Sequence, residues 1–326
     1  MPHEATRSRG LRRYAAQPDR YAERYGHFTF TARDYEILDL IYRYRYLEAR
    51  HVRALVLGSS QQVTRRLQGL FHNKYIRRYV PRLRMRPDLD TGAPLLGYGL
   101  ELRGARALQA YRARLAGESA AEPELVRWRK EYTRRSEWFL EHQLMISNFR
   151  CVLELALRQT PGVELLNWDQ GQDIWFRVPV PGEHSRFLRV APDAGFSIRE
   201  ADHVRHFFLE IDRSTEEHSR LLRKFQGYWW YLQSPAYQHT YANHRRVNVL
   251  FVTTGRKRML NMINALRAMP KPNRGDHGGK GLFWFCLNEE FTLESPSFVL
   301  RAIWSTASDS VRADRLQSLT QIVVSG

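Results

Sequence analysis

The chain has 326 residues, of which 43% are hydrophobic and 12% aromatic, and this composition excludes a disordered protein. Its 51 Lys and Arg exceed its 34 Asp and Glu, and the formal net charge of +17 makes a polyanion the expected partner. A membrane span and secretion are not expected, because the chain contains no run of about 18 apolar residues and no apolar signal segment. The two cysteines, Cys151 and Cys286, lie far apart and match no CxxC spacing, which favours a cytoplasmic protein.

Residues 29–115 have the pattern of a winged helix-turn-helix domain. Three short amphipathic helices are followed by two strand-like segments on either side of a loop at 87–94. The first helix begins with the capping-box spacing of Thr31 and Asp34, and the third follows a turn at Gly58. This order predicts a recognition helix and a wing, the elements with which such domains bind duplex DNA.

The third helix carries side chains suited to DNA contacts. Val63, Leu67 and Leu70 form its inward apolar stripe, which leaves polar and basic residues on the outer face. No acidic residue occurs between Glu48 and Asp88, and this one-sided charge favours phosphate contact over a winged helix used only for protein contacts. The residues expected to bind duplex DNA are Gln61, Gln62, Thr64, Arg65, Arg66, Gln68, Lys74, Arg77 and Arg78.

The rest of the chain predicts a linker and a second domain. Residues 116–135 combine small residues, Pro123 and mixed charges, as expected of a linker or connecting helix. Residues 136–326 then alternate between a long helix capped by Ser136, several strands, a helix, a strand, a helix and a last strand. This order predicts a mixed sheet flanked by helices, an α/β (α+β) fold. Residues 1–28 are expected to be a flexible basic arm.

Acidic residues gather at the ends of two predicted strands in the second domain. Pro192-Asp193 stands between two strand-like segments, and Glu210 and Asp212 end the next one. Side chains alternate along a strand, so Glu210 and Asp212 share one face with Phe208. Adjacent antiparallel strands would bring Asp193 close to Glu210. Two or three convergent carboxylates suffice to bind Mg²⁺ (or Mn²⁺) for phosphodiester cleavage.

These motifs resemble the PD-(D/E)XK nuclease superfamily and, more narrowly, the replication-relaxation proteins of plasmids and other mobile elements. Those proteins are similar in joining a winged helix to a segment like "PDAGFSI", then "FFLEIDRSTE" and a Lys-containing helix, and the likeness covers about residues 30–265. The resemblance implies a nuclease-like mixed sheet in which Asp193 and Glu210 bind metal. It also implies an additional acid from the preceding helix, which Glu141 would match, with Glu154 as a rival.

One position departs from the superfamily pattern. Asp212 stands where the superfamily has a Lys that orients the attacking water and stabilises developing negative charge. Lys224 is a substitute, because Leu221 and Tyr228 place it on the apolar face of the following helix, where it needs an anionic partner. In the alternative reading, Lys224 only pairs with Asp212, and the domain grips DNA without cleaving it.

The combined expectation is a DNA-binding protein of a mobile element with a Mg²⁺-dependent, endonuclease-like activity that nicks or cleaves duplex DNA during replication, relaxation or mobilisation. Asp193, Glu210 and Asp212 would hold the metal, and Lys224 would act on the water or the transition state, with Glu141 as additional acid. The alternative is a non-catalytic accessory factor or transcriptional regulator with an inactive nuclease-like domain. Contacts with other replication, mobilisation or recombination proteins and a homodimer are left open.

Overall fold

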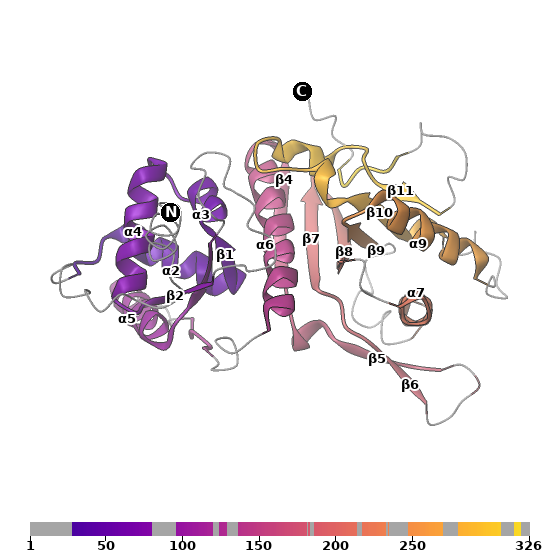
Figure 1. Ribbon diagram of the computed structural model, residues 1–326, viewed down its shortest axis with the longest axis horizontal. Coiled ribbons are helices and arrows are strands. Elements are labelled where there is room, and N and C mark those ends of the chain that lie inside the picture. Colours follow the sequence, from indigo (N-terminus) through magenta and orange to yellow (C-terminus); the bar gives the residue numbers. More distant parts are fainter. Residues whose placement is uncertain are drawn as a thin grey trace, which may run out of the picture. The chain divides into compact units, whose positions relative to one another are not determined.

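The computed structural model describes residues 28–79, 96–119, 124–128, 136–180, 182, 186–213, 217–232, 234, 247–269, 280–307 and 316–320. The chain divides into two compact units, Met1–Cys151 and Val152–Gly326 (Figure 1). The division falls inside helix α6 (Glu137–Arg158), beyond the predicted linker at 116–135. Among the described residues, no helix combines the length and apolar character needed to cross a membrane.

The first unit contains the predicted winged helix-turn-helix. It consists of three helices and a sheet with the strand order β1-β3-β2, in which β1, a strand that the sequence did not predict, lies between the first and second helices, and β2 and β3 pair antiparallel as the wing. The predicted loop at 87–94 lies outside the described residues. The elements before α6 are α2 (Ala32–Tyr44), β1 (Tyr46–Glu48), α3 (Ala49–Leu55), α4 (Ser60–His72), β2 (Ile76–Tyr79), β3 (Gly97–Leu100) and α5 (Leu102–Ser119).

A buried carboxylate joins α2 to α4 in this unit. Asp34 is fully buried and accepts hydrogen bonds from the backbone N–H and the hydroxyl of Thr31, both at 2.7 Å. These contacts confirm the predicted capping box. Asp34 also forms an ion pair with Arg66 of α4, so one side chain both caps the first helix and holds the third helix against it. The predicted inward stripe of α4 is buried as well.

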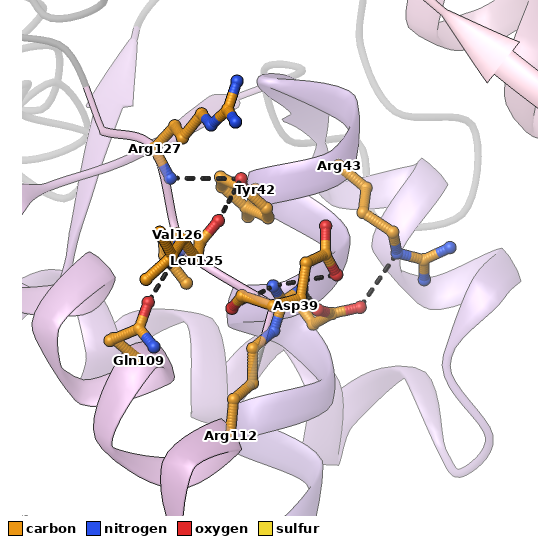
Figure 2. Close-up of polar contacts among 9 residues, drawn as sticks. Asp39, Tyr42, Arg43, Gln109, Arg112, Leu125, Val126 and Arg127 are labelled. Carbon is orange, nitrogen blue, oxygen red and sulfur yellow. Dashed lines mark hydrogen bonds and ion pairs between the residues drawn. The ribbon is translucent and has the colours of Figure 1, made fainter. Parts of the chain in front are cut away.

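The described part of the predicted linker, residues 124–128, lies along α2 and α5 (Figure 2). The hydroxyl of Tyr42 donates to the carbonyl oxygen of Leu125 at 3.2 Å and accepts from the backbone N–H of Arg127 at 3.1 Å. Arg112 of α5 donates to the carbonyl oxygen of the segment's first residue at 3.3 Å. Hydrogen bonds to two helices therefore hold this segment in the first unit.

The first part of α6 also belongs to the first unit. The Ser147 hydroxyl donates to the carbonyl oxygen of Tyr46 at 2.6 Å, and Arg150 donates to the carbonyl oxygen of Arg43 at 2.8 Å. These bonds satisfy backbone groups where α2 ends and β1 begins. They explain why the two units divide after Cys151 rather than in the predicted linker.

The second unit is built on a mixed six-stranded sheet of the predicted α/β type, with the order β11-β10-β9-β8-β7-β4. Strands β4, β7 and β8 pair antiparallel, whereas β8, β9 and β10 are parallel. A separate antiparallel hairpin consists of β5 and β6. The strands and main helices are β4 (Val163–Asp169), β5 (Phe176–Pro179), β6 (Phe187–Val190), β7 (Ala194–Glu200), β8 (His203–Asp212), α7 (His218–Leu232), β9 (Val247–Thr253), α9 (Arg256–Ala268), β10 (Phe283–Leu287) and β11 (Ser305–Thr306).

Helices α7 and α9 pack on the same face of the parallel part of this sheet (Figure 1). Phe208 of β8 and Phe251 of β9 lie in one buried cluster with Phe225 of α7 and Met262 of α9. Because Glu210 and Asp212 share the Phe208 face of β8, both carboxylates point into the layer that these two helices cover.

We expect the Asp34→Ala variant to lose about 2–4 kcal/mol of unfolding free energy, because the Arg66 guanidinium and the N–H and hydroxyl groups of Thr31 lose their acceptor. The loss stays below that of a fully buried pair, since the Arg66 side chain is 25% exposed. Urea unfolding followed by circular dichroism measures the change.

The matched control is Asp39→Ala on the same helix. Asp39 pairs with Arg43 and Arg112 but is 30% exposed, so its loss should cost about 1 kcal/mol or less. Equal losses in the two variants would contradict the structural role of Asp34.

Candidate functional site

The pairing of β7 with β8 places Asp193 beside Glu210. Ala194 lies opposite Leu209 in the antiparallel register, and the backbone N–H of Asp193 donates to the carbonyl oxygen of Leu209 at 2.9 Å. The Asp193 carboxylate turns back over β8, where its Oδ2 accepts from the backbone N–H of Ile211 at 2.8 Å. Two residues 17 positions apart in the sequence therefore meet at one strand end.

Helix α7 supplies the groups that hold Glu210. The carboxylate is only 2% exposed, and its Oε2 lies 2.9 Å from Lys224 Nζ. Its Oε1 accepts a short hydrogen bond of 2.5 Å from the hydroxyl of Tyr228, which is fully buried. Lys224 and Tyr228 are four residues apart and so lie on the same face of the helix, one turn from each other.

The electrostatics of Glu210 reflect this mixture of burial and pairing. Burial raises its pKa to about 7, and the negative charge of Asp193 adds to the rise. The Lys224 ammonium and the Tyr228 hydrogen bond act in the opposite direction and favour the charged form. A carboxyl group with a pKa near neutrality, next to a second carboxylate, is typical of functional sites.

Asp212 lies two residues further along the same face and has its own cation. Its oxygens accept two hydrogen bonds of 3.0 Å from Nε and Nη2 of Arg258, the bidentate geometry that guanidinium groups favour. The hydroxyl of Thr253 adds a third bond at 2.9 Å, since Asp212 and Thr253 are neighbours in the parallel register of β8 and β9. Asp212 thus sits in an ion pair at the position where the resembled superfamily has a Lys.

The predicted metal ligands differ in the groups that surround them. Among the residues described, no three His, Cys, Asp or Glu side chains gather in a way that could hold a metal ion. Asp193 and Glu210 are neighbouring carboxylates, the kind of hard oxygen donor that Mg²⁺ prefers, but Lys224 and Tyr228 engage Glu210 just as Arg258 engages Asp212. Glu141 lies on the part of α6 that belongs to the first unit, and its rival Glu154 lies in the second.

Sequence reasoning missed Tyr228 and Arg258 as members of this site. Tyr228 was expected only to mark the apolar face of α7, yet its hydroxyl reaches a carboxylate. The sequence contains a signal for this contact, because Tyr228 follows Lys224 by four residues and so lies on the same face of the helix. A buried Tyr hydroxyl also requires a polar partner. Arg258 stands in the first turn of α9, directly after β9, and the parallel pairing of β9 with β8 brings it to Asp212.

The predicted DNA-contacting residues of α4 are largely at the surface. Gln61, Gln62 and Arg65 are exposed, as is Lys74 just after the helix. Thr64 and Gln68 are half-buried, and the Thr64 hydroxyl donates to the carbonyl oxygen one turn earlier at 2.8 Å. The exposed members form the outer face of a helix whose opposite face is in the core.

Three of the predicted DNA-contacting arginines make contacts within the first unit. Arg66 pairs with Asp34, and Arg77 lies 2.6 Å from a carboxylate oxygen of Glu101. Arg78 is 4% exposed, with its guanidinium 3.9 Å from the centre of the Phe71 ring. Their side chains stabilise the packing of α4 and the wing, and Arg78 does not reach the surface.

The family of the chain follows from comparison with known proteins. No curated protein and no solved structure matches the chain. A family model described as replication-relaxation matches residues 38–247, well over half of the chain, and its span includes α4 together with Asp193, Glu210 and Lys224. The chain therefore belongs to the replication-relaxation family, which associates it with the replication of plasmids and other mobile elements.

Proposed function

We propose that this protein binds duplex DNA through helix α4 and cleaves phosphodiester bonds at the Asp193–Glu210 site in a reaction that depends on a divalent metal. The observation that carries the proposal is the meeting of two carboxylates and Lys224 at the ends of β7 and β8. Membership of the replication-relaxation family supports a DNA substrate that belongs to a plasmid or another mobile element.

Each side chain of the site has a distinct part in this proposal. Asp193 and Glu210 would hold Mg²⁺ or Mn²⁺, whose charge polarises a bound phosphate and lowers the pKa of bound water. Lys224 places a positive charge beside Glu210, where it would stabilise negative charge that develops on the phosphate. Tyr228 fixes the orientation of the Glu210 carboxylate, and Arg258 neutralises Asp212 nearby.

A second candidate function is DNA binding without cleavage. The observation that favours it is the pairing of the acids with cations of the chain itself, Glu210 with Lys224 and Asp212 with Arg258. A site whose charges are matched internally is stable without a metal ion. In this case the second unit would take part in assembly or bind DNA without cleaving it, and the protein would act as an accessory factor or regulator.

Cleavage of supercoiled plasmid DNA in Mg²⁺ or Mn²⁺ separates the two functions. We expect wild-type protein to nick or linearise the plasmid and Asp193→Asn to lose this activity, because a neutral amide is a poor ligand for a hard cation. Lys224→Ala should slow cleavage by roughly 10²–10³-fold, the usual effect of removing one group that stabilises developing charge.

The control for this experiment is Glu164→Gln, which changes an exposed carboxylate on β4 and should cleave like wild type. Equal nicking by wild type and Asp193→Asn contradicts the proposed active site. Absence of cleavage by a wild type that still binds the plasmid supports the non-catalytic alternative.

Binding to duplex DNA tests the part of the proposal that concerns α4. We expect Arg65→Ala to weaken binding of a labelled duplex and to lower the slope of log K against log salt by about 1, since one phosphate contact is lost. Arg43→Ala is the control, because Arg43 is exposed but paired with Asp39 on α2. An unchanged slope in Arg65→Ala, measured by fluorescence anisotropy, would contradict a role for α4 in binding.

The raised pKa of Glu210 predicts how the metal-free protein responds to pH. A carboxyl group whose pKa is higher in the folded than in the unfolded state stabilises the fold while it is protonated. This contribution is complete below 4.5, the ordinary pKa of a Glu side chain, and is lost as the pH rises through about 7. In EDTA, scanning calorimetry should therefore show a decline in stability between these values in wild type and a smaller decline in Glu210→Gln. The same pH dependence in both proteins would show that Glu210 does not titrate in this range.

A further inference from the structure

One face of the β5–β6 hairpin packs against helix α7 (Figure 1). The ring of Phe176 stacks on Tyr231 with 3.6 Å between the ring centres. Val190 lies so close to Gly227 that a Cβ atom there would come within 2.5 Å of Val190 Cγ2. Only glycine allows this approach of the hairpin to the helix, so the inner face of the hairpin is firmly packed.

The outer face of the hairpin carries two arginines directly opposite each other. Arg177 pairs with Arg189 in the antiparallel register, and like charges at opposed positions destabilise a strand pair. In the part of the chain that the structure describes, neither guanidinium has a carboxylate partner. Each lies over an aromatic ring, Arg177 at 5.2 Å from the centre of Phe187 and Arg189 at 4.1 Å from Trp175.

The remaining surface of the hairpin supports a nucleic-acid partner. Residues 176–180, 182 and 186–190 contain no Asp or Glu, and Glu183 lies outside the described residues. Trp175 is 37% exposed and Phe187 is 48% exposed, so both hold their guanidinium groups at the surface. Stacked guanidinium groups keep N–H donors free for phosphate oxygens, and a two-stranded ribbon fits the major groove of B-DNA.

The hairpin is connected to the acidic site at two points. Strand β6 ends at Val190, three residues before Asp193. Phe176 of β5 contacts Tyr228, with 6.1 Å between the ring centres, and the Tyr228 hydroxyl holds Glu210. The hairpin that carries the outer face therefore leads directly into the carboxylate pair.

We propose that the outer face of the β5–β6 hairpin is a second DNA-contact surface, in which Arg177 and Arg189 bind the phosphate backbone of duplex DNA beside the Asp193–Glu210 site. This inference rests on the proposed DNA binding and adds the surface by which the second unit holds the duplex. Phosphate binding would also relieve the repulsion between the two opposed arginines.

The test compares variants of the full-length chain in binding to a labelled duplex at several salt concentrations. Arg177→Ala/Arg189→Ala should reduce the slope of log K against log salt by about 2, because two phosphate contacts are lost. The charge-matched control is Arg43→Ala/Arg199→Ala, which removes two exposed arginines paired with Asp39 and Glu164 and should keep the wild-type slope. Arg177→Lys/Arg189→Lys should retain most of the slope, and thermal melts verify that all variants fold.

Photo-crosslinking shows whether the contact is direct. A photoreactive residue in place of Phe187 should attach covalently to the labelled duplex, whereas one in place of Leu260, equally exposed on α9 at 47%, should not. An unchanged salt slope in the alanine variant, or adducts of position 187 only with protein, overturns the inference. If wild type binds and Arg65→Ala weakens binding while the hairpin variant does not, only this inference fails. If wild type binds no DNA, the proposed function fails as well.

Discussion

The arrangement of the second unit depends on one buried carboxylate, that of Glu210. A buried charge costs several kcal/mol unless it is paired and hydrogen-bonded, so its partners must stay in place. Both partners, Lys224 and Tyr228, come from α7, and satisfying the two oxygens of Glu210 fixes the rotation of this helix against the sheet. The β5–β6 hairpin packs on the same helix at Gly227, so its position follows from the same contact.

The cations around the acidic residues explain how three carboxylates coexist on neighbouring strand ends. Lys224 reaches Glu210 from α7, and Arg258 reaches Asp212 from α9, so each helix that covers this face of the sheet neutralises one acid. Asp193 adds a third negative charge and has a backbone N–H as its hydrogen-bond donor. Although position 212 is an Asp where a Lys is expected, Lys224 and Arg258 supply positive charge to the site. These basic groups lie on α7 and α9, and the acids with which they pair lie on β8.

Sequence reasoning predicted the elements whose signal is local. The capping box at Thr31, the inward stripe of α4 and the antiparallel neighbours of Asp193 follow from spacing and alternation, and the structure contains all of them. The partners of individual charged groups could not be predicted this way. Arg66 lies next to Arg65 in the sequence, yet only Arg66 meets the buried Asp34, because that contact depends on how two helices pack. For the same reason the pairing of Asp212 with Arg258, separated by 46 positions, had no local signal.

Because several arginines are paired within the fold, the net charge of +17 does not by itself show which surface binds DNA. Arginines such as Arg66 and Arg258 are neutralised inside the fold and offer little to a polyanion. Other arginines lie at the surface without a described carboxylate partner, and they include Arg65 on α4 and the opposed pair on the β5–β6 hairpin. When two weak sites are joined in one chain, binding at the first raises the effective concentration of DNA at the second. A hairpin with modest affinity of its own would then suffice to hold a phosphate backbone next to Asp193 and Glu210, provided that α4 binds first.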